Sequence, residues 1–398
     1  MNQALLLRNA RIYTPYEYIY PGYVLIENGI IKEIGREPYP HRLGYVDELD
    51  LNGMICGPGF IDTHIHGILG YDTMDGSEKS FIEMSKSLVR YGVTSFIPST
   101  VSAPHEKLIK VSEALYKSIL EWNPKVGARI LGLHMEGPYI SPVKAGAHNK
   151  QYIRDPSIEE FNQYYEASGG FIRELTLAPE LKNSLELIKH AVSRGVIVQL
   201  GHTNATYEET TNAIIAGASK ATHIYNAMRE IHHREPGVVV ALLRSPSIFV
   251  EIIVDFIHVS PQMVEFTIEY AGVNRIVAVS DAISATGLPD GVYSLGELKI
   301  EVKRGISRVV ETGSLAGSTL TMDRAFRNLV SLGYSIDEAF KMTSTNSARS
   351  INANIVEKIG LLKPGYKADI VVLDQNLEVA MTIVEGNVLY QKQVPGIS

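Results

Sequence analysis

Two histidines one residue apart close a short apolar run, Phe60-Ile61-Asp62-Thr63-His64-Ile65-His66-Gly67. In a β-strand, residues i and i+2 face the same side. His64 and His66 would therefore direct both imidazoles toward one point, as the ligands of a metal ion do. The alternative is two polar residues at a strand end, and a lone His-x-His motif does not decide between the two.

Other nitrogen and carboxylate side chains also stand at the ends of apolar runs. Glu136 ends Leu133-His134-Met135-Glu136, His202 follows Leu200-Gly201, His223 follows Ala221-Thr222, and Asp281 follows Val279-Ser280. A single histidine is more often a structural residue than a ligand. The chemistry of these residues therefore depends on whether the fold brings the strand ends together.

The middle of the chain alternates between strand-like and helical segments. Eight apolar runs cover 59–64, 93–99, 129–135, 172–178, 196–201, 219–224, 248–254 and 275–280. Helical stretches between them include 77–91, 104–121, 182–194, 206–216 and 260–271. Eight strand–helix units predict a closed (β/α)8 barrel over residues 59–358, an α/β fold whose active site lies at the carboxyl ends of the strands.

Both ends of the chain are rich in β-strand patterns. Residues 24–34 form a predicted hairpin around Asn28-Gly29, a strong two-residue turn signal. Similar patterns return at 368–373, 379–384 and 388–391. We therefore predict a small β-sandwich domain built from residues 1–58 and 359–398.

In such a barrel the six candidate residues converge on one face. They end five different strands and comprise His64, His66, Glu136, His202, His223 and Asp281. Imidazole and carboxylate ligands suit zinc, iron or manganese better than calcium. A metal with three protein ligands and an open position lowers the pKa of water to about 7, which predicts hydrolysis of an amide, ester or amidine. An aspartate at that water can carry its proton to a leaving group.

Composition narrows the class of protein. The chain has 398 residues and a net charge of -7, from 37 basic and 44 acidic residues, without a basic run. These features argue against nucleic acid or an anionic membrane as a partner. The single cysteine, Cys56, excludes an intramolecular disulfide. The first residues lack the pattern of a signal peptide, and no run approaches the roughly 20 apolar residues of a membrane helix. We expect a cytoplasmic protein.

Jointly, the motifs resemble those of the amidohydrolase superfamily and, within it, the N-acetylglucosamine-6-phosphate deacetylases. The matching segments are Pro58-Gly59-Phe60-Ile61-Asp62-Thr63-His64-Ile65-His66-Gly67, His134-Met135-Glu136-Gly137-Pro138-Tyr139, Lys144-Ala145-Gly146-Ala147-His148, Gly201-His202-Thr203-Asn204-Ala205, Thr222-His223-Ile224-Tyr225-Asn226-Ala227-Met228, His232-His233-Arg234-Glu235-Pro236-Gly237, Ser280-Asp281-Ala282 and Leu315-Ala316-Gly317-Ser318-Thr319-Leu320-Thr321-Met322. His-x-His alone would indicate only the superfamily.

The resemblance implies a role for each matching residue. It implies principal metal ligands at Glu136, His202 and His223, second-metal positions at His64 and His66, and a catalytic acid/base at Asp281 that also touches metal. It implies that His148 lies over the acetyl group with Ala147 beside it, that His258 contacts the sugar, and that Leu315, Ala316 and Gly317 belong to a loop closing over the ligand. It implies that Asn226, Ala227 and Arg234 bind phosphate and sugar, with Arg234 reaching across a homodimer interface.

The expected reaction is deacetylation of N-acetyl-D-glucosamine 6-phosphate with one or two divalent ions of zinc, iron, manganese or cobalt. Two alternatives stay open: a deacetylase of another N-acetylhexosamine phosphate or of N-acyl amino acids, and a catalytically silent scaffold. Phe256 replaces a glycine found in many relatives and would narrow the sugar pocket or reshape its loop. Residues 284–318 form a predicted hairpin insertion that is either a lid or only packing.

Overall fold

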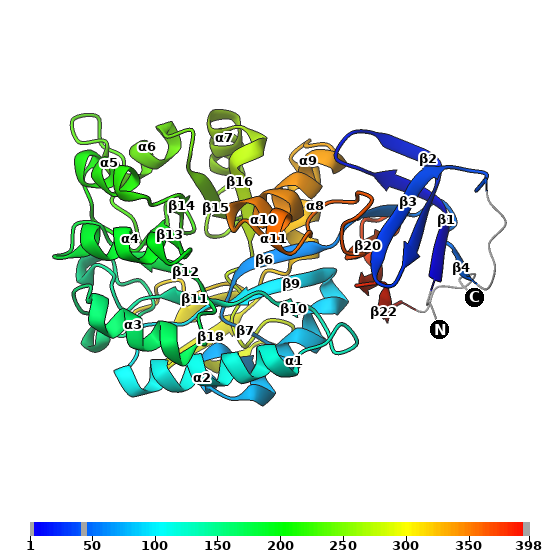
Figure 1. The fold of residues 1–398 in the computed structure, drawn as a ribbon. Helices are drawn as coiled ribbons and strands as arrows, with labels where there is room; N and C mark the ends of the chain where they lie inside the picture. Colours follow the sequence, from blue (N-terminus) through cyan, green and yellow to red (C-terminus); the bar gives the residue numbers. More distant parts are fainter. Residues whose placement is uncertain (1–3, 41–45, 393–398) are drawn as a thin grey trace.

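The structure is a computed structural model that describes residues 4–40 and 46–392. It contains a barrel of parallel strands surrounded by helices, with a β-sheet to one side that is built from both ends of the chain (Figure 1). Residues 1–3, 41–45 and 393–398 of the predicted small domain lie outside the described residues.

The barrel wall follows the eight predicted runs in sequence order. Its strands are β6 (Phe60–Ile65), β9 (Val93–Pro98), β10 (Arg129–Ile130), β11 (Leu133–Glu136), β12 (Ile172–Leu177), β13 (Ile197–Leu200), β14 (Lys220–Ala221), β15 (Phe249–Ile253) and β16 (Ile276–Val279). β10 and β11 are two parts of one predicted run. Parallel pairing joins β10, β9 and β6, and separately joins β11 through β16 in order.

Two backbone contacts close these sheets into a ring. Between β9 and β11, the Thr100 N–H donates to the His134 carbonyl oxygen at 3.0 Å. Between β6 and β16, the Asp281 N–H donates to the His64 carbonyl oxygen at 2.9 Å. Because all wall strands run in one direction, their carboxyl ends meet at one mouth of the barrel.

Helices cover the outside of the barrel (Figure 1). They are α1 (Glu78–Leu88), α2 (His105–Glu121), α3 (Ile158–Ala167), α4 (Ser184–Ser193), α5 (Tyr207–Ala216), α6 (Gly237–Arg244), α7 (Pro261–Ala271), α8 (Met322–Ser331), α9 (Ile336–Phe340), α10 (Asn346–Ser350) and α11 (Ala353–Val356), with a π-helical turn at Lys341–Thr345. Short 3₁₀ turns lie at Thr73–Asp75, Val89–Tyr91, Pro142–Lys144, Lys150–Tyr152 and Val273–Arg275.

The five helical stretches predicted at 77–91, 104–121, 182–194, 206–216 and 260–271 are confirmed as α1, α2, α4, α5 and α7, and local capping explains their ends. α5, for example, begins at a reciprocal cap in which the side chains of Thr206 and Glu209 bind each other's backbone N–H. It ends at Gly217, whose φ of 121° suits glycine. Among the described residues, no helix has the length and apolar character needed to cross a membrane.

The two chain ends share one eight-stranded sheet. Its strands are β1 (Ala4–Tyr13), β2 (Tyr18–Glu27), β3 (Ile30–Arg36), β4 (Asp47–Asp50), β5 (Ile55–Pro58), β20 (Ile370–Leu373), β21 (Val379–Val384) and β22 (Asn387–Gln391). β5 pairs with β1 on one side and with β20 on the other, so it joins the N-terminal and C-terminal strands. The predicted hairpin turn is present at Asn28 and Gly29, with φ values of 52° and 78°.

An antiparallel insertion separates β16 from α8. It consists of β17 (Gly291–Leu295), β18 (Leu298–Lys303) and β19 (Ile306–Val309). The hairpin insertion predicted within residues 284–318 is confirmed, with a turn between β18 and β19 at residues 303–306. A small ribbon of β7 (Gly67–Ile68) and β8 (Tyr71–Asp72) follows the first barrel strand.

Candidate active site

Four histidines surround one buried carboxylate at the mouth of the barrel. The Nε2 atoms lie near the Glu136 carboxylate oxygens, at 2.9 Å for His223, 3.1 Å for His202, 3.2 Å for His66 and 3.4 Å for His64. All five side chains are buried. We call these five residues the His–Glu cluster. The structure thus brings together residues that the sequence places at the ends of four different strands.

Asp281 faces the same cluster from the end of β16. Its Oδ1 atom lies 3.2 Å from His66 Nε2 and 3.6 Å from His64 Nε2. Burial alone would raise the pKa of this carboxyl, but the two imidazoles outweigh burial and lower it. Asp281 is therefore placed as a carboxylate, able to accept a proton in the center of the site.

A backbone feature aims three of these residues into the mouth. His202, His223 and Asp281 adopt positive φ angles of 46°, 26° and 50°. Few residues other than glycine adopt this left-handed region, and such strain concentrates at functional sites. Each residue stands where its strand ends and the chain turns away, so the turn directs the side chain over the barrel mouth.

Hydrogen bonds fix the tautomer of three cluster histidines. Their Nδ1 atoms each face an oxygen: His64 at 3.2 Å from Glu251 Oε2, His66 at 3.1 Å from Ser99 O, and His202 at 3.0 Å from Lys144 O. An oxygen acceptor requires a proton on Nδ1, so each ring in its neutral form directs its Nε2 lone pair into the cluster. Oxygen atoms that orient histidine in this way are typical of metal centers.

The donor set fits a divalent metal. His64 Nε2 is buried without a hydrogen-bond partner among the described residues, which is costly unless another group satisfies it. Two ligand atoms on one tetrahedral zinc ion lie about 3.3 Å apart, given zinc–nitrogen distances of about 2.0–2.1 Å. The cluster distances match that spacing. Three sets of side chains lie close enough to share an ion: His64, Glu136 and His223; His64, His66 and Asp281; and Glu136, His148 and His202.

His148 differs from the three cluster histidines above in which ring nitrogen carries the proton. Its Nδ1 atom accepts the Ser102 backbone N–H at 2.9 Å, so a neutral ring carries its proton on Nε2. That Nε2 lies 3.6 Å from Glu136 Oε2. Burial lowers the pKa of His148 to about 4, which keeps the ring neutral near pH 7. In this form His148 is placed as a hydrogen-bond donor toward the site.

A cavity of about 300 Å³ opens over the cluster. Its wall contains most of the sequence-predicted residues, namely His66, Glu136, Ala147, His148, His202, His223, Asn226, Ala227, His258, Asp281, Leu315 and Gly317. His258 is oriented by Asp255, whose Oδ2 atom lies 2.8 Å from Nδ1. The other predicted residues lie elsewhere: His64 is beneath the cavity, Ala316 is buried behind its neighbors, and Arg234 is exposed on a loop.

Phe256 is half-buried and packs against the barrel core, and it does not line this cavity. Its φ is 65°. This value explains why glycine would suit the position, because glycine adopts positive φ without steric cost.

Sequence reasoning missed a charged network beneath the cluster. Lys220 Nζ lies 2.6 Å from Glu174 Oε1 and 2.7 Å from Glu251 Oε1, and it also donates to Thr63 Oγ1 at 3.0 Å. The three charged side chains are fully buried. Glu251 also holds His64 Nδ1, so the network supports the cluster from below. Charged residues within apolar strands, such as Glu251 in Phe249–Ile253, were the available signal.

Comparison with known proteins identifies the family of this site. Residues 55–389 match the amidohydrolase family. The chain belongs to the amidohydrolase family. It is 36% identical to N-acetylglucosamine-6-phosphate deacetylase of Bacillus subtilis, with 98% of each chain covered. It is 37% identical to N-acetylgalactosamine-6-phosphate deacetylase of Escherichia coli O157:H7, with 96% of this chain and 98% of the relative covered.

A solved structure is also similar over nearly the whole chain. It is a variant of N-acetyl-D-glucosamine-6-phosphate deacetylase from Mycobacterium smegmatis in complex with N-acetyl-D-glucosamine-6-phosphate. The TM-score is 0.91 at 33% identity, with 98% of this chain and 100% of that chain covered. The mixed α/β barrel of this chain is therefore the fold of its amidohydrolase relatives.

Proposed function

We propose that this protein hydrolyzes the acetamide of N-acetyl-D-glucosamine 6-phosphate to D-glucosamine 6-phosphate and acetate. The observation that carries the proposal is the His–Glu cluster with the Asp281 carboxylate facing it, in a chain about one-third identical to deacetylases of phosphorylated N-acetylhexosamines. The complete ligand set argues against a silent scaffold on the same fold.

The cluster would hold one or two divalent ions of zinc, iron, manganese or cobalt. Glu136, His202 and His223 would bind the first, and His64 and His66, with Asp281, the second. When bound, such an ion lowers the pKa of a water molecule and polarizes a carbonyl group.

Two residues of the chain would then handle protons and charge. Asp281, an acceptor in the center of the site, takes a proton from the attacking water and delivers it to the amine as the C–N bond breaks. His148 donates its Nε2–H to the acetyl oxygen as negative charge develops there. The Ser102 N–H fixes this tautomer and so keeps the donor directed at the site.

The rest of the cavity suits a phosphorylated sugar. Asn226, Ala227 and His258 would contact phosphate and sugar on one side, and the loop 315–317 would close over the ligand. We further propose a homodimer in which Arg234 reaches the partner's site. Its exposed position outside the cavity of its own chain supports this, as does the bidentate fit of guanidinium to phosphate.

We also propose the division of the chain predicted above, with a small β-sandwich domain of 1–58 and 359–398 and a barrel of 59–358. This division is supported by a separate hydrophobic core cluster within the small domain, which includes Leu7, Val24, Ile370 and Ile383. A cytoplasmic location is supported by the single cysteine and by the phosphorylated substrate. The net charge of -7 supports a protein without nucleic-acid or membrane partners.

A second candidate substrate is N-acetyl-D-galactosamine 6-phosphate. The relative that carries this name is as similar to the chain as the glucosamine-phosphate deacetylases are, at 37% against 36% identity. The two sugars differ in one hydroxyl configuration, which the sugar side of the cavity must distinguish.

Acetate release from both sugar phosphates tests the proposal. We expect faster release from the glucosamine derivative, loss of release with chelator, and recovery with added divalent metal, with bound metals counted on the same sample. An N-acetyl amino acid serves as the control substrate and should be inert. Bound metal without acetate release from either sugar phosphate would refute the substrate assignment.

Arg234→Ala tests the phosphate contact separately. We expect KM to rise strongly for the phosphorylated sugar and little for unphosphorylated N-acetylglucosamine. Equal effects on both substrates would exclude Arg234 from phosphate binding.

A further inference from the structure

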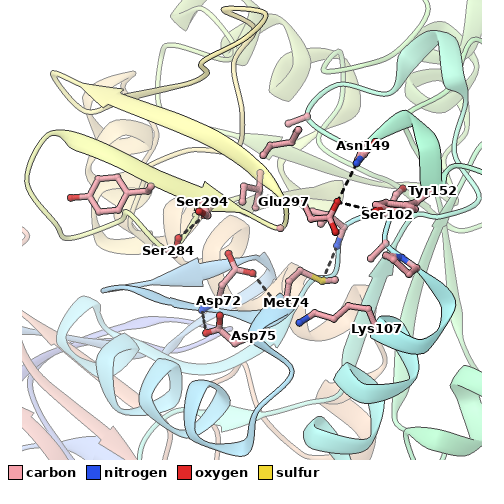
Figure 2. A pocket seen from close by; sticks show the side chains of 18 of the residues that line it. Asp72, Met74, Asp75, Ser102, Lys107, Asn149, Tyr152, Ser284, Ser294 and Glu297 are labelled. Carbon is pink, nitrogen blue, oxygen red and sulfur yellow. Dashed lines mark hydrogen bonds between the residues drawn. The ribbon is translucent and has the colours of Figure 1, made fainter.

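A second cavity of about 710 Å³, shown in Figure 2, shares part of its lining with the active-site cavity. It is walled by the 3₁₀ turn at Thr73–Asp75, the start of α2 and the hairpin of β17 and β18. Val101, Ala147 and Leu295 line both cavities. The two spaces are therefore neighbors that share a wall of small and apolar side chains.

One carboxylate oxygen in this second cavity lacks a partner. Asp72 is only 7% exposed, and its Oδ1 atom accepts the Met74 N–H at 2.8 Å, while Oδ2 has no hydrogen-bond partner among the described residues. Figure 2 shows the Asp72 carboxylate at the cavity wall beside Met74, and Lys107 lines the same cavity. Leaving a buried carboxylate oxygen unpaired is costly, so the position favors a ligand that donates a hydrogen bond.

The other carboxylates of the cavity already have partners. Glu297 Oε2 accepts from Asn149 Nδ2 at 3.3 Å and from the Tyr152 hydroxyl at 3.0 Å. Asp75 Oδ2 accepts from the Asp72 N–H at 3.0 Å and from a serine hydroxyl. Asp72 Oδ2 is thus a buried carboxylate oxygen that lacks a partner among the described residues, and it lies beside Met74 at the wall of this cavity.

The order of strands in the barrel relates this cavity to the reaction. Asn226 and His258, on the proposed sugar side, follow β14 and β15, the sixth and seventh wall strands. Val101 and Ala147 follow β9 and β11, the second and third. In a ring of eight, these pairs of strands are opposite each other. A substrate with its sugar phosphate on one side therefore has its acyl group directed to the other, toward the second cavity.

We propose that the second cavity receives acyl groups longer than acetyl, and that Asp72 binds a hydroxyl or ammonium donor at their far end. The inference rests on the proposed function. The substrates would be glucosamine 6-phosphates with extended N-acyl groups that carry such a donor. The reaction is the same hydrolysis: the oxygen of water bonds to the acyl carbon, the C–N bond breaks, the amine gains the proton, and the longer acid leaves as its carboxylate.

The test compares matched N-acyl glucosamine 6-phosphates: acetyl, butanoyl, pentanoyl, 4-hydroxybutanoyl and 5-hydroxypentanoyl. With the metal-loaded protein we expect kcat/KM for the better hydroxyacyl substrate to lie within about tenfold of that for acetyl, and above that for the plain acyl group of equal length. If the protein hydrolyzed the acetyl substrate but none of the substrates with a longer acyl group, the inference would be overturned. Failure on acetyl itself would instead count against the proposed function.

Asp72→Asn separates binding from a structural role. The amide keeps an oxygen for the Met74 N–H but replaces the unpaired acceptor Oδ2 with a donor. We expect kcat/KM to fall for the hydroxyacyl substrate and to change little for the plain acyl substrate of equal length, so that the preference for the hydroxyl group is lost. An equal change in kcat/KM for the hydroxyacyl and the plain acyl substrate would show a structural role and overturn the assignment of Asp72.

Ser294→Trp tests the cavity as the path of the acyl group. Ser294 is exposed on β17 and lines the second cavity but not the first. We expect the indole to exclude extended acyl groups while acetyl is still hydrolyzed. Val292→Trp is the matched control, since Val292 is exposed on the same strand and lines neither cavity. Equal loss for acetyl and extended substrates in Ser294→Trp alone would overturn the path.

Discussion

Replacing Lys220 with methionine tests the charged network beneath the active site. Lys220 is fully buried, and its Nζ atom lies 2.6 Å from Glu174 and 2.7 Å from Glu251. Methionine has a similar length and leaves little empty volume. The change therefore removes the positive charge and leaves two buried carboxylates facing each other, with no cation between them.

The expected loss in the free energy of unfolding is large for one substitution. Removing one partner of a buried ion pair costs about 3–5 kcal/mol. At roughly 2.1 cal/mol/K per residue, a chain of this length has an unfolding entropy of about 0.8 kcal/mol/K. The free-energy loss then corresponds to a fall in Tm of about 4–6 °C. Calorimetry on wild type and Lys220→Met with equal metal content measures this shift.

The pH dependence of the same variant has a definite sign. Burial raises the pKa of Glu174 to about 7 from its ordinary 4.5, even though Lys220 lowers it. Without Lys220 the folded-state pKa rises further. A carboxyl with a raised pKa stabilizes the fold when protonated, and this contribution is lost as pH rises from about 4.5 through the folded-state value. The Tm difference between variant and wild type should therefore be larger at pH 8 than at pH 6.

Two control variants make the result decisive. Lys86→Met removes an exposed ion pair with Glu83, whose atoms lie 2.8 Å apart, and should lower Tm by less than about 1 °C. Adding Glu174→Gln to Lys220→Met removes one of the two facing charges and should recover part of the loss. If Lys220→Met left Tm unchanged at both pH values, the Lys220 charge would not stabilize the two buried carboxylates.

Three further predictions concern the site, the barrel's contact with the sheet, and the single thiol. Asp281→Asn should lower kcat by about 100-fold or more while the ion held by Glu136, His202 and His223, counted by elemental analysis, persists; near wild-type turnover would remove Asp281 as acid/base. Arg129→Met breaks a buried ion pair with Asp369 at 2.7 Å and should lower Tm by several degrees, with an unchanged Tm as the contrary result. Cys56 is fully buried, which raises its pKa to about 12, so thiol reagents should label it only after denaturation, and rapid labeling of the native protein would contradict this.

The sequence alone was sufficient for the architecture of the barrel. Strand–helix alternation is local, and each element carries its own signals, such as the reciprocal cap of α5 and the Asn28-Gly29 turn. Because parallel strands align their carboxyl ends, the positions of His64, Glu136 and His202 at strand ends already predicted one shared site. The amidohydrolase relatives then confirmed the family.

Tertiary structure alone decided how that site is supported. The tautomer of His148 depends on the N–H of Ser102, 46 residues away in the chain. The orientation of His64 depends on Glu251, which is 187 residues away and is itself held by Lys220. No local periodicity encodes such contacts, because they arise only when distant strands close into a ring. The second cavity at Asp72 has the same origin, since its wall joins segments separated by more than 200 residues.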